Sequence, residues 1–260
     1  MTSKLIYETR IEQLPVSVYE TNQAMGAAAA HTTAEALRRA ISERGVANII
    51  LAAANSQLTF LAALREDKTI PWDKVNTFHM DEYIGIDAVH PASFPLFLRR
   101  NLIDHVRAKA FYTLAGQAKE IEMMMGEYAR LLREYPADVC ALGYGENGHL
   151  AFNDPPFADF NDPLLVKVVR LAEMSRRQQV GEGHFRTLND VPTHAVTLTI
   201  PALLAAKIVV AIVPEARKAN AVKRALTGAI DEECPGSILR RVPHAHLFLD
   251  RDSAGTLKFT

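Results

Sequence analysis

The sequence is poor in features that mark several classes of protein. It has only two cysteines, Cys140 and Cys234, which lie far apart in the chain. Two cysteines cannot form a metal cage unaided, and we expect both to be reduced thiols. No stretch approaches the roughly 18 uninterrupted apolar residues that a membrane span requires. We therefore expect no cysteine-based metal centre and no membrane-spanning segment.

Charge of one sign is also lacking. Lys and Arg total 29 against 30 for Asp and Glu, so the formal net charge is -1. Such a balance supplies no overall field for nucleic acid or an anionic membrane, and we expect neither as a partner. The first twenty residues lack the apolar core and the small-residue cleavage site of a secretory signal. We therefore expect a cytoplasmic protein in which any anionic ligand is bound by a local site.

What is present is typical of a folded α/β protein: 260 residues, 48% of them hydrophobic and 23% charged. Residues 20–44 have apolar positions at helical spacing before Gly45, and an apolar strand at 46–53 and a helix at 57–65 follow. The same order recurs in strands 75–80, 138–143, 195–199 and 207–213 and in helices 93–106 and 215–227. The alternation predicts one domain over residues 1–260 with a doubly wound, mostly parallel, Rossmann-like sheet.

One segment, residues 155–192, breaks this alternation. It has early prolines, two glycines and a dense polar stretch, SRRQQVGEGHF. We interpret it as a lid or insert over the functional site. Ligands of open parallel sheets bind beyond the carboxyl ends of the strands, so each loop that follows a predicted strand is a candidate for chemistry.

Two such loops carry titratable groups. In the first, Asp81 and Glu82 directly follow an apolar strand; carboxylates in such places usually cap a helix or face water. The second spans residues 143–155, where three glycines within six residues permit a tight turn close to a ligand. Glu146, His149 and Asp154 lie in or beside that turn. His149 is therefore a candidate acid-base group, although a lone histidine is most often structural.

A third group of residues could bind an anion. The turn before helix 57–65 would present backbone N–H groups and the positive end of a helix dipole. It comprises Ala54, Asn55 and Ser56. Ser56 could equally be a plain helix cap, and Lys218, early in the last helix, could be a solvated surface charge. Arg176 or Arg177 of the lid could close on a phosphate through bidentate hydrogen bonds. Together these donors predict a phosphate ester as the ligand.

These motifs resemble those of the glucosamine-6-phosphate deaminase family. The resemblance rests on FHMDEYIG at 78–85, HPASF at 90–94 and GENGHLAFNDP at 145–155, and it follows nearly the whole chain in order. It implies the fold shared by these deaminases, 6-phosphogluconolactonases and ribose-5-phosphate isomerases. It also implies conversion of glucosamine 6-phosphate and water to fructose 6-phosphate and ammonia, without metal or organic cofactor. Many relatives form oligomers, which leaves a homo-oligomer open for this chain.

The resemblance also implies roles for single residues. Asp81 would be the base that moves a proton from sugar C2 to C1, and His149 would assist opening of the pyranose ring. Asp154 takes the place of a glutamate in the family motif, and Asn147 that of an aspartate. An amide can orient a histidine but cannot offset imidazolium charge, so Glu146 is a candidate for the missing carboxylate.

The same matching implies a phosphate site. Lys218, Ser56 and a lid arginine would hold the phosphate; Arg176 matches best, and a shift of one residue would select Arg177. The turn at 54–56 differs from the glycine-rich threonine turn that is usual in the family. These departures leave the sugar epimer undetermined.

Three alternatives to a glucosamine-6-phosphate deaminase remain at this point. The first is the same reaction on another hexosamine phosphate, such as galactosamine 6-phosphate. The second is hydrolysis of 6-phosphogluconolactone on the same fold, which the intact runs at 80–83 and 151–155 disfavour. The third is a sugar-phosphate sensor that lost turnover through Asn147; a sensor has no need of a base such as Asp81 at a strand end.

Overall fold

The computed structural model describes residues 4–155 and 157–257. Its centre is an eight-stranded sheet in the order β1-β2-β11-β10-β7-β3-β4-β6, in which every neighbouring pair except β1 and β2 is parallel. These strands are β1 (Leu5–Ile11), β2 (Leu14–Tyr19), β3 (Ala47–Leu51), β4 (Val75–His79), β6 (Ala110–Tyr112), β7 (Val139–Leu142), β10 (Ile208–Val213) and β11 (Ala245–Asp250). The prediction of a mostly parallel, doubly wound sheet is confirmed.

A second, smaller sheet is antiparallel and has the order β5-β9-β8. Its strands are β5 (Asp81–Tyr83), β8 (Val166–Arg170) and β9 (His194–Leu198). Residues 195–199 do form a strand, but assigning that strand to the parallel sheet was wrong. An apolar strand can be buried in either kind of sheet. This strand, β9, pairs with β5 and with β8, and β8 lies within the segment predicted to be a lid.

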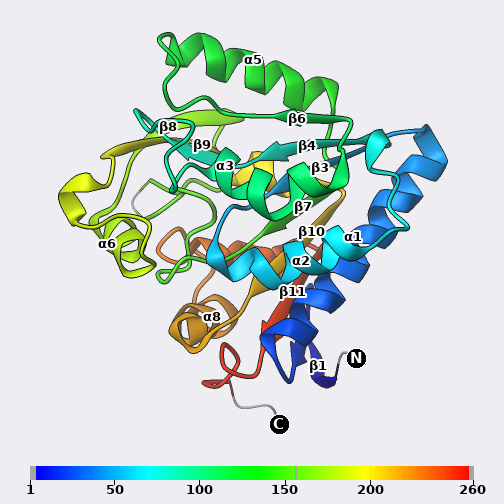
Figure 1. Cartoon of the computed structure of the whole chain (residues 1–260). Coiled ribbons are helices and arrows are strands. Elements are labelled where there is room, and N and C mark those ends of the chain that lie inside the picture. The colour runs from blue at the N-terminus through cyan, green and yellow to red at the C-terminus, as the bar shows by residue number, and fades with distance from the viewer. Residues whose placement is uncertain (1–3, 156, 258–260) are drawn as a thin grey trace.

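The helices lie in the connections between the strands of both sheets (Figure 1). They are α1 (Asn22–Arg44), α2 (Leu58–Glu66), α3 (Phe94–Leu98), α4 (Asp104–Val106), α5 (Ile121–Glu134), α6 (Glu173–Gly181), α7 (Ile200–Leu204) and α8 (Ala219–Thr227). Short helical turns are η1 (Asn55–Gln57), η2 (Trp72–Lys74), η4 (Leu188–Asp190), η5 (Ala216–Lys218) and η6 (Pro235–Arg241), and η3 (Arg99–Ile103) is a π-helical turn. Helix α1 ends at Gly45, whose φ of 77° is costly for other residues.

Successive residues of the central strands face opposite sides of the sheet, and both sides are buried. In β3, Ile49 packs in one core cluster and Ile50 in the other; in β10, Val210 and Val209 divide in the same way. Helices α1 and α2 lie over one of these faces, and Figure 1 shows them together beside β10 and β3, with α5 at the far end of the molecule. The continuously apolar strands are therefore covered on both faces, as the sequence indicates.

The order of the strands places a crevice at the centre of the sheet. From β3 the chain proceeds outward to β4 and β6, and it then returns to the other side of β3 as β7, followed by β10 and β11. The loops after β3 and β7 consequently leave the sheet in different directions, which is where open α/β sheets bind ligands.

Two further findings concern the predicted organisation. Within the described ranges, no helix combines the length and apolar character needed to cross a membrane. One domain over residues 1–260 stays a prediction; residues 1–3 and 258–260, and Pro156 of the predicted lid, lie outside the described residues.

Candidate active site

A cleft of about 560 Å³, counted to its open mouth, lies at the carboxyl ends of the central strands. The loops after β3, β4, β7 and β10 form its floor, and the segment around α6 forms one wall. Its lining comprises Ala52, Ala53, Ala54, Ser56, Gln57, Met80, Asp81, Phe94, Gly143, Tyr144, Gly145, His149, Ala151, Phe152, Gln178, Gln179, Glu182 and Lys218. The structure therefore brings together Asp81, His149, Ala54, Ser56 and Lys218, five of the residues selected from the sequence.

Asp81 is the first residue of β5, where the chain leaves the central sheet. The residue is 7% exposed and borders the cleft. Burial, and secondarily the charge of Glu82, raise the pKa of Asp81 well above its ordinary value. A carboxyl group with a raised pKa is a stronger base than an exposed one, which suits it to abstract a proton from carbon.

Glu82 points away from this cleft because β5 is extended and successive side chains alternate. Its carboxylate accepts hydrogen bonds from Tyr83 N, Ser93 Oγ and Phe94 N, at 2.8, 2.9 and 3.1 Å. Burial raises the pKa of Glu82 to about 7, although these three hydrogen bonds lower it in part. Glu82 therefore caps the start of α3, and only Asp81 of the pair reaches the cleft.

A buried histidine fixes the backbone at Asp81. His79 Nε2 accepts a hydrogen bond of 2.9 Å from Leu114 N, so Nδ1 carries the proton and donates to Asp81 O, also at 2.9 Å. Burial lowers the pKa of His79 to about 4, which keeps the ring neutral. Tyr128 of α5 accepts from His79 N and donates to His79 O. The sequence gives no sign of this support, because it joins segments distant in the chain.

The second titratable group of the cleft is a histidine paired with a carboxylate. His149 Nδ1 lies 2.8 Å from Asp154 Oδ1 and 3.2 Å from Ser175 Oγ. The Asp154 side chain is only 1% exposed, and burial alone would raise its pKa. The charge of His149 and hydrogen bonds from His149, Ser175 and Asn147 outweigh burial and lower the pKa of Asp154. Because Nδ1 faces Asp154, Nε2 is the ring nitrogen left for chemistry in the cleft.

Asn147 links the histidine to its carboxylate without lining the cleft. Its Oδ1 accepts from His149 N at 3.0 Å, and its Nδ2 donates to Asp154 Oδ1 at 2.7 Å. Glu146 does not supply a carboxylate to His149: its Oε1 lies 3.6 Å from Arg217 Nη1. The hypothesis of compensation by Glu146 is therefore not supported, because adjacent residues of this turn point in different directions.

Two glycines of the turn are required by close contacts. A Cβ on Gly145 would lie 2.1–2.3 Å from atoms of the His149 ring, and Gly145 N donates to His149 O. Gly148 has a φ of 89°, and a Cβ there would lie 2.6 Å from Cys234 Sγ. Gly145 thus lets the backbone pass against the imidazole, and Gly148 lets it turn with a positive φ beside Cys234.

The end of the cleft predicted to bind an anion is formed by the loops after β3 and β10. Ser56 lies in η1, which leads into α2, and its Oγ accepts from Gln57 Nε2 at 3.1 Å. Asn55 belongs to the same turn but does not line the cleft. Lys218 ends η5 and is 2% exposed; burial, the largest influence, lowers its pKa to about 8. A lysine buried at a cleft wall retains its charge most easily when an anion binds beside it.

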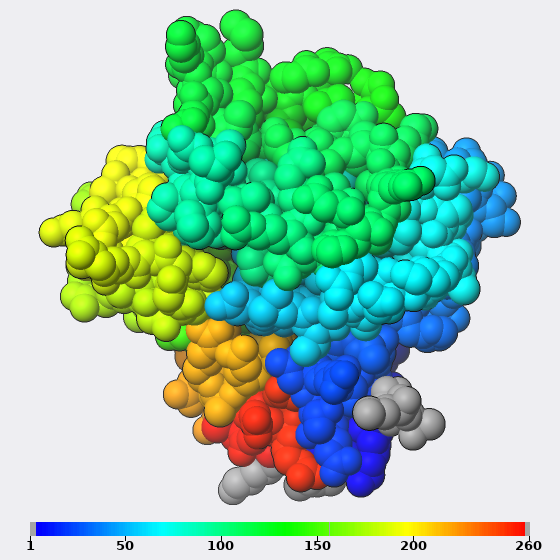
Figure 2. Space-filling model, viewed as in Figure 1, coloured from blue at the N-terminus to red at the C-terminus, as the bar shows by residue number. Residues whose placement is uncertain are grey.

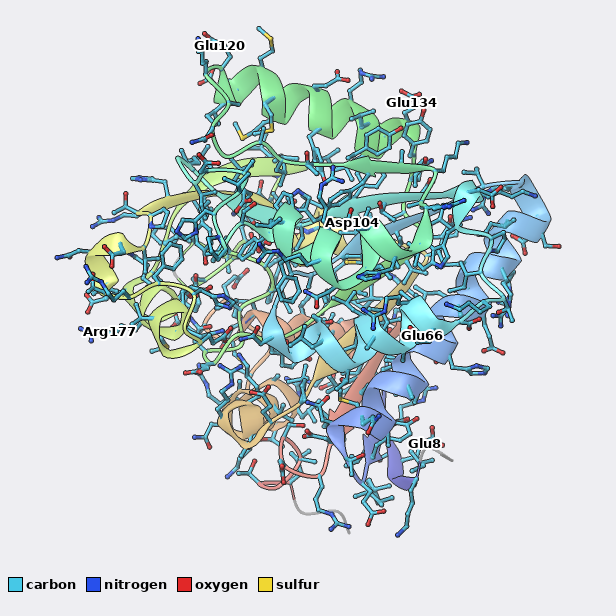
Figure 3. The ribbon with its side chains drawn as sticks, in the orientation of Figure 1. Glu8, Glu66, Asp104, Glu120, Glu134 and Arg177 are labelled. Carbon is cyan, nitrogen blue, oxygen red and sulfur yellow. The ribbon has the colours of Figure 1, made fainter. Side chains whose placement is uncertain are left out.

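The lid arginines do not reach the cleft in this structure. Arg176 Nη2 donates to Leu188 O and Val191 O, at 2.6 and 2.9 Å, and so holds the lid's own backbone. Arg177 pairs with Glu173, its side chain is 69% exposed, and Figure 3 shows it at the outer edge of the molecule. Figure 2 shows the lid as a yellow lobe against the teal segment after β4 and the orange segment of α8.

The lid contributes other residues, which the sequence analysis missed. Ser175 contacts Asp154, and Gln178, Gln179 and Glu182 line the cleft. Positions 175, 178, 179 and 182 lie on one face of a helix, a polar periodicity that would have identified them. Gln57 was also missed, because a glutamine after a turn carries no signal of its own.

The described residues include no group of three or more His, Cys, Asp or Glu side chains arranged to hold a metal ion. Cys140 and Cys234 are both buried and free, as expected from the sequence. The titratable side chains that line the cleft are two carboxyl groups, a histidine, a lysine and a tyrosine, which are suited to proton transfer and to anion binding.

Comparisons with known proteins agree with this arrangement. A family model described as glucosamine-6-phosphate isomerases/6-phosphogluconolactonase matches residues 20–247. A glucosamine-6-phosphate deaminase of Bacillus cereus (strain G9842) is 35% identical over 203 residues, and one of Bacillus anthracis (strain CDC 684 / NRRL 3495) is 34% identical over 203 residues. Each alignment covers 78% of this chain and 75% of the relative.

Solved structures give the same result. That of a monomeric glucosamine-6-phosphate deaminase superposes with a TM-score of 0.85 at 25% identity, over 93% of this chain and 99% of that one. A 6-phosphogluconolactonase from Shewanella baltica OS155 gives a TM-score of 0.73 at 19% identity, over 93% and 99%, a likeness of fold alone. The resemblance deduced from the sequence motifs is confirmed, and the chain belongs to the family of glucosamine-6-phosphate isomerases and 6-phosphogluconolactonases.

Proposed function

We propose that this protein is a glucosamine-6-phosphate deaminase, which converts glucosamine 6-phosphate and water to fructose 6-phosphate and ammonia. The observation that carries the proposal is the position of Asp81, a buried carboxyl group with a raised pKa, in the same cleft as the His149–Asp154 pair and Lys218. The deaminases that are 34–35% identical to this chain support the same choice.

The chemistry follows from the two titratable groups. His149, with Nδ1 bound to Asp154, can accept the proton of the anomeric hydroxyl at Nε2 and return it to the ring oxygen, which opens the pyranose. O1 of the open-chain aldehyde takes up a proton as Asp81, the carboxylate, removes the proton from C2; Asp81 then delivers its proton to C1 while the amino nitrogen gives up one proton. The product is a ketose imine at C2, and water hydrolyses it to the ketose and ammonia. Ring opening breaks the C1–O5 bond, and hydrolysis forms a C–O bond to water at C2 and releases ammonia; the remaining steps are proton transfers and need no redox partner. A positioned general base contributes about 10²–10⁴-fold to such a transfer.

The substrate's phosphate would lie at the other end of the cleft. Lys218 supplies a positive charge there, and Ser56 lies in the helical turn that leads into α2, whose first N–H groups would face the phosphate. The alternatives differ in what they demand of this geometry. A lactonase needs no base for a C–H bond, and a sensor needs no carboxyl group with a raised pKa; Asp81 favours the deaminase over both.

The test is a panel of glucosamine 6-phosphate, galactosamine 6-phosphate and 6-phosphogluconolactone, assayed for ammonia, ketose 6-phosphate and acid release. We expect ammonia and fructose 6-phosphate in equal amounts from the first substrate, with turnover unchanged after dialysis against a strong chelator. If galactosamine 6-phosphate released ammonia faster than glucosamine 6-phosphate, galactosamine 6-phosphate would be assigned as the substrate. Acid release from the lactone without ammonia from either amino sugar would refute the proposal. The cytoplasmic location, the absence of a nucleic-acid partner and the oligomeric state remain predictions.

A further inference from the structure

Arg217 precedes Lys218 in the chain and is surrounded by carboxylates from three segments. Its Nη1 lies 2.7 Å from Glu182 Oε1 of the lid and 3.6 Å from Glu146 Oε1 of the glycine turn. Its Nε lies 2.5 Å from Glu215 Oε2. One guanidinium thus joins the end of α6 in the lid to the turn that carries the cleft histidine and to the start of η5.

Glu182 is the buried member of these carboxylates. Its side chain is 5% exposed, against 38% for Glu146 and 36% for Glu215. Gln178 Nε2 donates to its Oε1 at 2.8 Å, and His184 Nε2 lies 3.4 Å from its Oε2. Burial would raise the pKa of Glu182, but hydrogen bonds and the charge of Arg217 lower it to about 2. Glu182 is therefore a full anion at neutral pH.

Glu182 lies on the cleft wall together with Lys218, whereas Arg217 does not line the cleft. In the described part of the chain, Lys218 has no carboxylate within ion-pair distance, although Glu182 is near enough to raise its pKa. The cleft wall therefore carries the carboxylate of Glu182 beside the buried ammonium of Lys218. Arg217, a second cation, contacts Glu182 from outside the cleft lining. A sugar phosphate at Lys218 would meet the negative charge of Glu182 unless that side chain moved.

We propose that Glu182 is an internal stand-in for the phosphate, and that a bound phosphate group replaces it on Arg217. The planar donors of a guanidinium accommodate a carboxylate and a phosphate alike, so the exchange leaves Arg217 fully paired. Glu215 keeps its contact with Nε and holds the arginine in place during the exchange. Arg217 and Lys218 then bind the phosphate together, and Arg217 supplies the second cation that Arg176 and Arg177 do not deliver here.

This inference rests on the proposed function only in taking a phosphate ester as the ligand. Its test uses inorganic phosphate, titrated calorimetrically into the full-length protein, and requires no turnover. We expect Glu182→Gln to bind inorganic phosphate about tenfold more tightly than the wild type, because the internal competitor has lost its charge. Glu215→Gln is the matched control: it also removes a carboxylate from Arg217, but one that does not line the cleft, and we expect less than a twofold change.

A double substitution identifies the cation involved. Arg217→Gln should weaken phosphate binding, and adding Glu182→Gln to it should restore little, because the carboxylate acts by occupying Arg217. If Glu182→Gln alone binds phosphate no more tightly than the wild type, the inference is wrong and Glu182 is part of the liganded site. A deaminase assay that fails while these titrations succeed would count against the proposed function and not against the exchange.

Hydrogen exchange on the wild type tests the same inference without any substitution. Saturating inorganic phosphate should speed exchange at the amides of residues 182–186, because the lid loses its tie to Arg217, while residues 55–58 become more protected. Unchanged or slower exchange in the lid segment would mean that Glu182 stays on Arg217, and would overturn the inference.

Discussion

The side-chain amide of Asn147 donates a hydrogen bond of 2.7 Å to the carboxylate of Asp154, which in turn holds His149 Nδ1 at 2.8 Å. The amide therefore has a defined hydrogen-bonding partner in this arrangement. Asp154 already provides the negative charge beside the imidazole, and a donor at position 147 is what that carboxylate needs. A second carboxylate there would face the first within hydrogen-bond distance.

We therefore expect Asn147→Asp to be harmful. Two carboxylates 2.7 Å apart cannot both ionise freely, so one would stay protonated near neutral pH and the pair would titrate together. We predict that kcat/KM falls about tenfold or more and that its pH profile gains a step absent from the wild type. A variant with the wild-type profile would show that the turn relaxes enough to separate the two carboxylates.

Gly145 offers a second test of this part of the site. A Cβ there would lie 2.1–2.3 Å from the His149 ring, so Gly145→Ala must displace the imidazole. A small misplacement of a catalytic group can cost about 10²-fold, and we expect a loss of that order in kcat. Gly126→Ala is the control, since nothing lies within 4 Å of a Cβ in that position of α5. It should leave kcat unchanged and raise stability by up to about 1 kcal/mol.

The sequence predicted the parts of the fold that depend on local pattern. The long helix α1, with its glycine stop, and the apolar strands β3, β4, β7 and β10 were all predicted to within a few residues. The hairpin β1–β2, the strands β6 and β11 and the helix α5 were not assigned. Strands of three residues, such as β6, are too short for a periodic signal. The predicted alternation of strands and helices did not require a further helix at the position of α5, so α5 was left unassigned.

The candidate site was likewise predictable only in the parts that depend on local pattern and sheet topology. Loops at strand ends could be located because the topology of a parallel sheet brings them together, and Asp81 and His149 do meet there. The direction of a long side chain could not be predicted. Arg176 turns to carbonyl groups of its own lid, and Glu146 turns to Arg217, because those partners come from segments whose positions only the folded chain defines.

Lys218 gives a prediction that depends on pH. Its buried ammonium has a pKa of about 8, so its positive charge is lost as the pH rises through that value. We expect KM for the sugar phosphate to increase above about pH 8 in the wild type. Lys218→Ala should raise KM about 10–150-fold at pH 7, equivalent to a charged hydrogen bond of 1.5–3 kcal/mol, and should abolish this alkaline rise. Lys223→Ala, on the exposed face of α8, should do neither.

Asp81 links catalysis to a cost in stability. Burial raises the pKa of Asp81 in the folded state above the ordinary value near 3.8 that it has when unfolded. Between these two pKa values the folded state binds more protons than the unfolded state, so the free energy of unfolding decreases as the pH rises. A buried base therefore destabilises the protein under the conditions in which it works.

Asp81→Asn should separate the two effects. The amide cannot accept a proton from carbon, and we expect kcat to fall at least about 10²-fold. The same variant carries no charge into the cleft, so its free energy of unfolding at pH 7–8 should exceed that of the wild type by at least about 1 kcal/mol. This gap should close only as the pH falls below about 3.8, where the wild-type carboxyl group becomes protonated in both the folded and the unfolded state. Glu82 is present in both proteins, so its own titration does not produce the gap. Urea unfolding of the two proteins across this pH range measures the gap. A difference that did not change with pH would mean that Asp81 is not buried as a titrating group, and its assignment as the base would lose its physical support.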